Sequence, residues 1–241
     1  PEGRAPDSEL FKLVKNKIPV VVTENIMFPE LFSHVASDNL SASKELAAHL
    51  IKSGRRKIFF ASGHSAKDNA RARGCASACQ EAGLPFDQSH VVNAGSLSQD
   101  ESLNYKSEAI SALFDRSRAV RPDAIMADND MLAIKIMETL RSLGLKIPQD
   151  VAITGFDNLF FAEHSTPPLT TASQNHYQMG KRAAELLLAK IRSPDAPWPL
   201  SETIPCQTVI RQSSCSDERL NPRTAESNPA KNATCIYSNA I

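Results

Sequence analysis

The chain has 241 residues, of which 41% are hydrophobic and 22% are charged, a composition typical of a globular protein rather than a disordered or fibrous one. Its 27 Lys and Arg residues balance its 27 Asp and Glu residues, so the zero formal net charge predicts no basic surface for nucleic acid or an anionic membrane. No apolar run approaches the roughly 20 residues that span a bilayer. The five cysteines are odd in number and lack C-x-x-C spacing, which favours a reduced, cytoplasmic setting.

Apolar strands alternate with helices along the chain. In chain order, the pattern predicts a strand at 18–23, a helix at 41–53, a strand at 57–62, a helix at 69–82, a strand at 89–95, a helix at about 102–117, a strand at 123–128, a helix at 129–144 with Asp130 as its N-cap, a strand at 150–156, a helix at 174–191 and a strand at 206–212. Continuous apolar strands joined by helices of this length predict the α/β class, with a parallel sheet covered on both faces. Residues 216–241 are polar without periodicity and are expected to be a disordered tail.

Polar side chains follow three of the predicted strands, at the edge of the sheet where open α/β proteins bind ligands. Arg71 starts the helix after the strand at 57–62, Asn129 follows the strand at 123–128, and Asp157 follows the strand at 150–156. Carboxylates accept hydrogen bonds from hydroxyl groups, Asn both donates and accepts them, and Arg offers a rigid fork of donors. This set suits a polyhydroxylated or amide-bearing small molecule.

Each of these side chains also has a structural interpretation. Asp130 is expected to cap a helix rather than contact a ligand, Asn129 could close a turn, and Asp157 could equally well cap a loop. His64 followed by Ser65 raises the possibility of a nucleophile, but no acid is spaced to orient the imidazole and no G-x-S-x-G motif is present. Because the chain also lacks a P-loop, a G-x-G-x-x-G motif and metal-ligand spacing, we expect no catalysis, no metal and no cofactor.

Several short motifs, taken together and in order, resemble a known family. Between Pro122 and Thr171 the chain contains P-D-A-I, N-D-x-x-A, G-L-x-I-P-x-D-V-A-I-x-G-F-D and P-P-L-T-T, and V-I-R-Q-S-S follows at 209–214. Over residues 18–214 the chain resembles the effector-binding core of the lactose-repressor/galactose-repressor (LacI/GalR) family of bacterial transcription regulators.

The resemblance implies a type I periplasmic-binding-protein-like fold, in which two Rossmann-like lobes joined by crossover strands enclose a ligand cleft. The N-terminal lobe would comprise residues 1–54 and 173–196, and the C-terminal lobe residues 55–172 and 197–215. The first lobe is expected to be truncated at its N-terminus, because the strands that open it in the family are absent from the sequence. Leu97 stands near the position where the family often stacks an aromatic ring on its ligand. The effector contacts that the resemblance implies are Asp38, Arg71, Asn129, Asp157 and His176.

The function that the resemblance implies is that of a sensor and not an enzyme. A small polar effector, such as a sugar, would bind between the lobes and control operator DNA binding allosterically. The chain would act as a homodimer and reach DNA only through a helix-turn-helix head that its sequence does not contain. A periplasmic sugar-binding protein of a transport system is the alternative on the same fold. Dimer contacts are expected from Met131, Ile134, Phe160 and Phe161, although the two phenylalanines could instead pack onto their own lobe.

Overall fold

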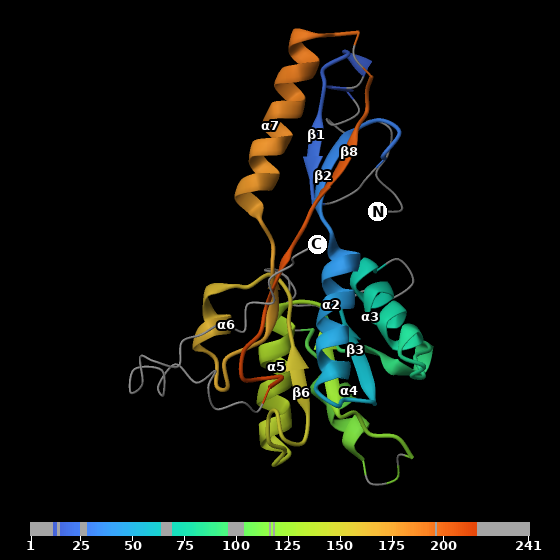
Figure 1. Ribbon diagram of the computed structural model, residues 1–241, viewed down its shortest axis with the longest axis vertical. Coiled ribbons are helices and arrows are strands. Elements are labelled where there is room, and N and C mark those ends of the chain that lie inside the picture. Colours follow the sequence, from blue (N-terminus) through green and yellow to red (C-terminus); the bar gives the residue numbers. More distant parts are fainter. Residues whose placement is uncertain are drawn as a thin grey trace. The chain divides into compact units, whose positions relative to one another are not determined.

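Parallel strands alternate with helices along the chain, which confirms the predicted α/β class. The computed structural model describes residues 12–13, 15–24, 28–63, 69–95, 104–115, 117, 119–195 and 197–215. The chain divides into two units, the first comprising Pro1–Ala42 and Gln174–Gln207 and the second Ser43–Ser173 and Thr208–Ile241 (Figure 1). Within the described ranges, no helix is both long and apolar enough to cross a membrane.

The first unit is built on a three-stranded parallel sheet with the strand order β1-β2-β8. Its strands are β1 (Val21–Thr23), β2 (Ser33–Ser37) and β8 (Ser201–Ile204). Helix α7 (His176–Arg192) packs against this sheet, and Val35 of β2 forms a small core with Met179 and Leu186 of the helix. The helix begins after Asn175, whose side chain accepts a hydrogen bond from the backbone of Gln178.

The second unit is built on a four-stranded parallel sheet with the strand order β4-β3-β5-β6. Its strands are β3 (Ile58–Ser62), β4 (Val91–Asn93), β5 (Ala124–Ala127) and β6 (Ala152–Thr154). Its helices are α2 (Asn39–Lys52), which starts in the first unit, α3 (Ala70–Glu81), α4 (Ser107–Ser111) and α5 (Asp130–Ser142), with short 3-10 turns at Gln88–His90 and Ala112–Phe114. Because all four strands run in the same direction, their carboxyl ends share one edge of the sheet.

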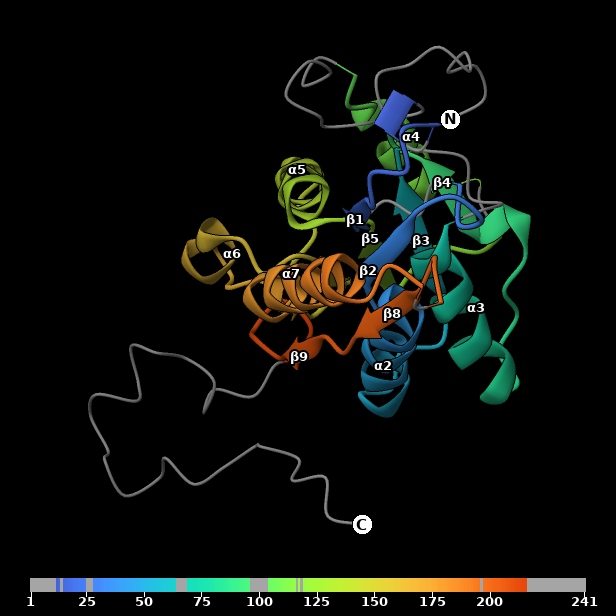
Figure 2. The same cartoon turned by 90° about the horizontal axis from the view of Figure 1, so that it is seen from above.

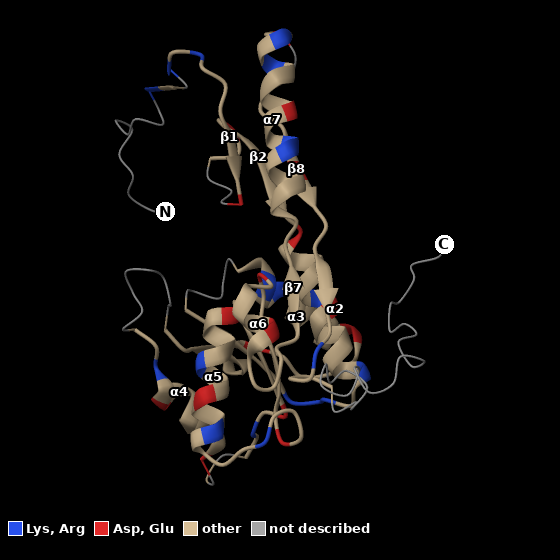
Figure 3. Ribbon diagram, turned by 90° about the vertical axis from the view of Figure 1, so that its left-hand side faces the viewer, with Lys and Arg blue, Asp and Glu red and all other residues tan. Residues whose placement is uncertain are grey.

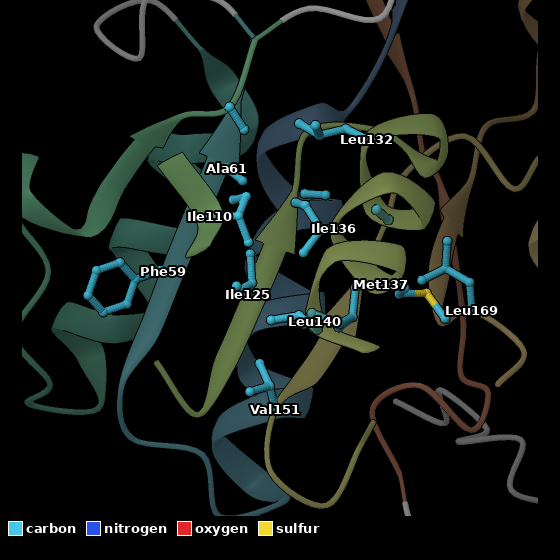
Figure 4. Packing of buried hydrophobic residues seen from close by; sticks show 14 of the residues in the cluster. Phe59, Ala61, Ile110, Ile125, Leu132, Ile136, Met137, Leu140, Val151 and Leu169 are labelled. Carbon is cyan, nitrogen blue, oxygen red and sulfur yellow. The ribbon is translucent and has the colours of Figure 1, made fainter. Parts of the chain in front are cut away.

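Both faces of this sheet are covered, as the continuous apolar strands predict. On one face, α5 packs against side chains of β3, β5 and β6; the buried cluster includes Phe59, Ala61, Ile125, Leu132, Ile136, Met137, Leu140 and Ile153 (Figure 4). Side chains alternate along β3, so Ile58 and Phe60 point to the opposite face of the sheet. Helices α2 and α3 cover that face (Figure 2). Leu46 and Leu50 of α2 and Cys75 of α3 are buried.

A short helix and two short strands complete the second unit. They are α6 (Phe160–His164), β7 (Thr171–Ser173) and β9 (Gln207–Val209), whose first residue is the last one of the first unit, and β7 pairs with β9. Ser213 then joins the segment after β9 to the edge of the sheet at β6, because its backbone carbonyl accepts from the Ile153 amide at 2.8 Å and its hydroxyl donates to the Ile153 carbonyl at 2.6 Å.

The structure differs from the sequence-based expectations in several elements. Strands β2 and β8 were not expected, because β2 reads Ser-His-Val-Ala-Ser and its polar residues, although buried, hide the strand pattern. The expected helix at 102–117 is reduced, within the described residues, to α4 and the 3-10 turn that follows it. The prediction that Asp130 caps α5 is wrong: Asn129 is the N-cap, and Asp130 is the first helical residue.

The division into units also differs from the expected lobes at two places. Residues 201–204 pair with β2 and therefore lie in the first unit, whereas the expected division placed them in the second lobe. Helix α2 was expected in the first lobe, but from Ser43 onward it belongs to the second unit, to which the Ser43 hydroxyl is tied by a 2.6 Å bond to the Arg71 carbonyl. The expected tail at 216–241 lies outside the described residues.

Candidate ligand site

A cluster of polar side chains occupies the carboxyl-terminal edge of the second unit's sheet. Arg71 lies in the first turn of α3, which follows β3. Asp128 follows β5 directly, and Asp157 follows β6 after two residues. The strands thus bring together side chains that are up to 86 residues apart in sequence.

Arg71 is held from three sides. Its Nη2 lies 3.3 Å from Oδ1 of Asp157, its Nη1 donates to the backbone carbonyl of Asp128, and its guanidinium carbon stands 3.7 Å from the ring centroid of Phe156. The Arg71 and Asp157 side chains are 18% and 24% exposed, so they are shielded but still reachable. A guanidinium over an aromatic face and beside a carboxylate is a pre-organised donor with little freedom left to lose on binding a ligand.

A second group of contacts connects α3 to the ends of β3 and β5. The Asn69 side chain caps α3, since its Oδ1 accepts from the amide of Arg71 at 2.9 Å. Its Nδ2 donates to Oδ1 of Asp128 at 3.0 Å, and the hydroxyl of Ser62 donates to Oδ2 of Asp128 at 3.0 Å. Neither Asn69 nor Asp128 was among the predicted site residues, although an acid directly after a predicted strand and an Asn at a predicted helix start are the signals that could have identified them.

The loop after β6 places Asp157 through an unusual backbone. Asp157 and Asn158 have φ values of 103° and 53°, a region that non-glycine residues seldom adopt. The Asp157 amide donates to the Ala172 carbonyl at 2.9 Å, and Oδ1 of Asn158 accepts from Nη2 of Arg211 at 2.9 Å. Contacts on both sides therefore hold this loop in a conformation that costs backbone free energy, as is common where a side chain must be aimed at a ligand.

Asp130 lies behind the site and is 0% exposed. Its Oδ2 accepts from the Leu159 amide at 2.8 Å, and its Oδ1 accepts from the Thr171 hydroxyl at 2.6 Å. Burial raises the pKa of this carboxyl to about 6, the two hydrogen bonds oppose that shift, and the nearby charge of Asp157 adds to it. With no exposed oxygen, Asp130 supports the loop that carries Asp157 rather than meeting a ligand.

The five expected effector residues are found in different places. Arg71 and Asp157 are in contact at the edge of the second unit's sheet. Asn129 lies between them in sequence and has the structural role considered above, since its Oδ1 accepts from the Leu132 amide at 2.8 Å and caps α5. Asp38 and His176 belong to the first unit, where Asp38 accepts from the Ser41 amide at 3.0 Å and His176 is the exposed first residue of α7.

Other features considered from the sequence lie elsewhere. His64, Ser65 and Leu97 fall outside the described residues. Among the residues that the structure does describe, no group of three or more His, Cys, Asp or Glu side chains could hold a metal ion. A cavity of about 590 Å³ opens beside Arg121 and Val151, which precede β5 and β6, so it lies at the opposite edge of the sheet from Arg71 and Asp157.

The sequence of residues 47–214 matches the model of a known family, described as the periplasmic binding protein-like domain. The HTH-type transcriptional repressor PurR of Photobacterium profundum is 28% identical over 211 residues, which cover 86% of this chain and 61% of that protein. A LacI family transcriptional regulator from Enterococcus faecium, solved with bound ribose, is 25% identical and superposes with a TM-score of 0.70 over 87% of this chain and 75% of that one. The regulator CelR in complex with cellobiose is 27% identical, with a TM-score of 0.71 over 86% of this chain and 62% of that one. The chain spans 50 to 61% of the length of the first curated relatives that it matches.

Proposed function

The chain belongs to the periplasmic binding protein-like domain family, and we propose that it is the effector-binding core of a LacI-type transcriptional regulator. The observation that carries the proposal is the pair of Arg71 and Asp157, held together at 3.3 Å at the carboxyl ends of parallel strands. In this position the pair offers one rigid fork of donors and one set of acceptors to a small molecule.

The chemistry of the site favours a polyhydroxylated effector. A sugar hydroxyl both donates and accepts, so adjacent hydroxyls can bridge the Asp157 carboxylate and the Arg71 guanidinium. The same pair rejects analogues that lack a hydroxyl, because a shielded polar group would then be left without its partner. Two relatives of known structure hold ribose and cellobiose, which supports a sugar as the effector class.

The proposed output is allosteric control of DNA binding rather than catalysis. An effector that prefers one arrangement of the two units would shift the population toward that arrangement. The relatives are named as HTH-type regulators, so operator DNA would be bound by a helix-turn-helix head of the whole protein, in the cytoplasm. Along α5, Lys and Arg are interspersed with Asp and Glu, and in α7 Glu185 lies among the basic residues (Figure 3).

A homodimer is part of the proposal. Met131 and Phe160 are 42% and 83% exposed, and the bond between Asp130 and the Leu159 amide brings their neighbouring residues together. Helices α5 and α6 are neighbours (Figure 2). Their exposed apolar residues Met131 and Phe160 therefore suit a contact with a second copy. Ile134 packs partly on its own core, so we expect it to contribute less than Phe160.

Thermal unfolding with D-ribose and with cellobiose tests the proposed effector class. A ligand that binds only the folded protein stabilises it by about 2.7 kcal/mol at a concentration 100 times its Kd, so the binding sugar should raise the Tm. Arg71→Ala should abolish the rise, whereas Arg73→Ala, a change of the same kind at an exposed position in the same helix, should leave it intact. An equal rise in both variants would refute the assigned site, and no rise with any sugar of a broad panel would refute the assigned effector class.

A further inference from the structure

The carboxylate of Asp128 is a fixed group beside the proposed site. Asn69 and Ser62 each donate one hydrogen bond of 3.0 Å to it, one to each oxygen. The backbone carbonyl of the same residue accepts from Arg71, so Asp128 and Arg71 cannot separate without breaking that bond. The residue is only partly buried, and each carboxylate oxygen can accept more than one hydrogen bond, so the group retains acceptor capacity toward solvent or a ligand.

The balance of charge at this edge is negative among the described residues. Arg71 and Arg211, which binds Asn158 beside Asp157, supply two positive charges, whereas Asp128, Asp157 and the buried Asp130 supply three carboxylates. The guanidinium of Arg71 already has the Asp157 carboxylate at 3.3 Å. A phosphate or carboxylate that approached the Arg71 fork would therefore displace or face the Asp157 carboxylate. It would also approach Asp128, whose own backbone carbonyl accepts from that fork, and like charges in a shielded site repel.

From these contacts we propose that Asp128 is a further specificity-determining residue, which excludes anionic effectors and restricts the site to uncharged or cationic polyhydroxy compounds. The inference rests on the proposed function in taking this edge of the sheet as the ligand site. It adds the charge class of the ligand, which separates a free sugar or an amino sugar from a sugar phosphate or a sugar acid.

Inorganic phosphate is the probe that tests this exclusion, because its binding does not depend on which sugar the protein recognises. The protein would be labelled with 15N at arginine, and the Arg71 side-chain Nε–Hε signal, assigned by its loss in Arg71→Lys, would be followed during titration with phosphate. The wild type should show no saturable change at Arg71. Asp128→Asn, which keeps the size of the side chain and an acceptor for Asn69, should gain saturable phosphate binding, with a Kd at least ~10-fold below the lower limit that the titration sets for the wild type.

Matched variants separate a local effect from a general one. Asp115→Asn also removes one negative charge, but at an exposed position that lines the cavity at the opposite edge of the sheet, and it should behave as the wild type does. Asp128→Ser provides a second neutral side chain in case the amide perturbs the fold, which urea denaturation of each variant would reveal.

Two results would overturn the proposal. One is saturable phosphate binding at Arg71 in the wild type, and the other is no gain in either neutral variant at position 128. If the exclusion of phosphate is observed while no sugar binds, the proposed effector class fails but the role of Asp128 stands. D-Ribose and D-ribose 5-phosphate provide the matching pair of ligands, and the phosphate ester should gain affinity relative to the free sugar only in Asp128→Asn and Asp128→Ser.

Discussion

The carboxylate of Asp130, in the first turn of α5, accepts a hydrogen bond from the hydroxyl of Thr171 in β7, with 2.6 Å between Oδ1 and Oγ1. Its second oxygen accepts from the amide of Leu159, which precedes α6. One buried side chain thus fixes the start of a helix, the loop after β6 and a strand that begins 41 residues later in the sequence. The position of Asp157 depends on all three, because Asp157 lies in that loop and its amide donates to Ala172 of β7.

Replacement of Asp130 by Asn should change how stability depends on pH. Burial raises the pKa of Asp130 to about 6, whereas a carboxyl in an unfolded chain titrates near about 3.9. The folded protein therefore binds this proton more tightly, so the stability that the protonated group contributes is complete below about pH 4 and is lost as the pH rises through about 6. Between pH 4 and pH 7 the free energy of unfolding of the wild type should fall by ~2–3 kcal/mol relative to Asp130→Asn.

Urea denaturation of both proteins across this pH range measures the effect. The comparison is a difference between two proteins, so contributions that are the same in both proteins cancel. A constant difference in unfolding free energy from pH 4 to pH 7 would contradict the raised pKa.

Two substitutions of Asp157 should weaken ligand binding alike but differ in their effect on stability. Both Asp157→Gly and Asp157→Ala remove the carboxylate that pairs with Arg71, so both should weaken sugar binding by at least ~10-fold. Only Gly adopts the φ of 103° without steric cost, so Asp157→Gly should be more stable than Asp157→Ala by about 1 kcal/mol. Chemical denaturation measures this difference, and equal stability of the two variants would mean that the backbone at this position is not strained.

Gly155 has no room for a side chain. A Cβ built on it would lie 2.3 Å from Oδ1 of Asp130 and 3.1 Å from the Cα of the same residue. Gly155→Ala should therefore destabilise the protein by ~1–3 kcal/mol, since the backbone of α5 must move away. Gly180→Ala is the matched control: Gly180 lies inside α7 with nothing within 4 Å of the added Cβ, and the change should stabilise the helix by ~0.5–1 kcal/mol. Differential scanning calorimetry of the two variants should show shifts of Tm in opposite directions, and a stable Gly155→Ala would refute this account of the packing.

The proposed dimer contact can be tested at Phe160, which is 83% exposed on α6. Phe160→Glu places a charge in the centre of the proposed contact and should weaken self-association by at least ~10-fold. Tyr177→Glu changes a side chain that is 81% exposed on α7, and it should leave self-association unchanged. Sedimentation equilibrium compares the two, and a dimer that survives Phe160→Glu would place the contact on another surface.

The fold class was predictable from sequence because most strands are continuous apolar runs bounded by helix caps. "KIFFAS" and "DAIMAD" contain β3 and β5, and Gly83 and Gly144, with φ values of 68° and 76°, follow α3 and α5 where the sequence placed the helix ends. Strand β2 escaped prediction because the burial of His34 and two serines depends on partners distant in sequence, such as the Leu200 carbonyl that accepts from the His34 amide.

The candidate site was predictable in part for the same reason. Arg71 and Asp157 could be placed at one edge, since parallel strands align their carboxyl ends. The role of Asp128 could not, because it depends on hydrogen bonds to Asn69 and Ser62, which are 59 and 66 residues away in sequence. Asn129 and Asp130 could not be told apart as caps from spacing alone, because a shift of one residue exchanges an N-cap for a buried first-turn position.

The hydrogen bonds of Ser213 determine when, during synthesis of the chain, one edge of the second unit's sheet can be paired. Its amide donates to the Pro168 carbonyl, its carbonyl accepts from the Ile153 amide, and its hydroxyl binds the Ile153 carbonyl and the Thr170 amide, all at 2.6–2.9 Å. Until this residue leaves the ribosome, the amide and carbonyl of Ile153 at the outer edge of β6 lack this partner and are open to water or to another chain. The second unit therefore cannot pair this part of the β6 edge until the 40 residues from Gln174 to Ser213 have been made.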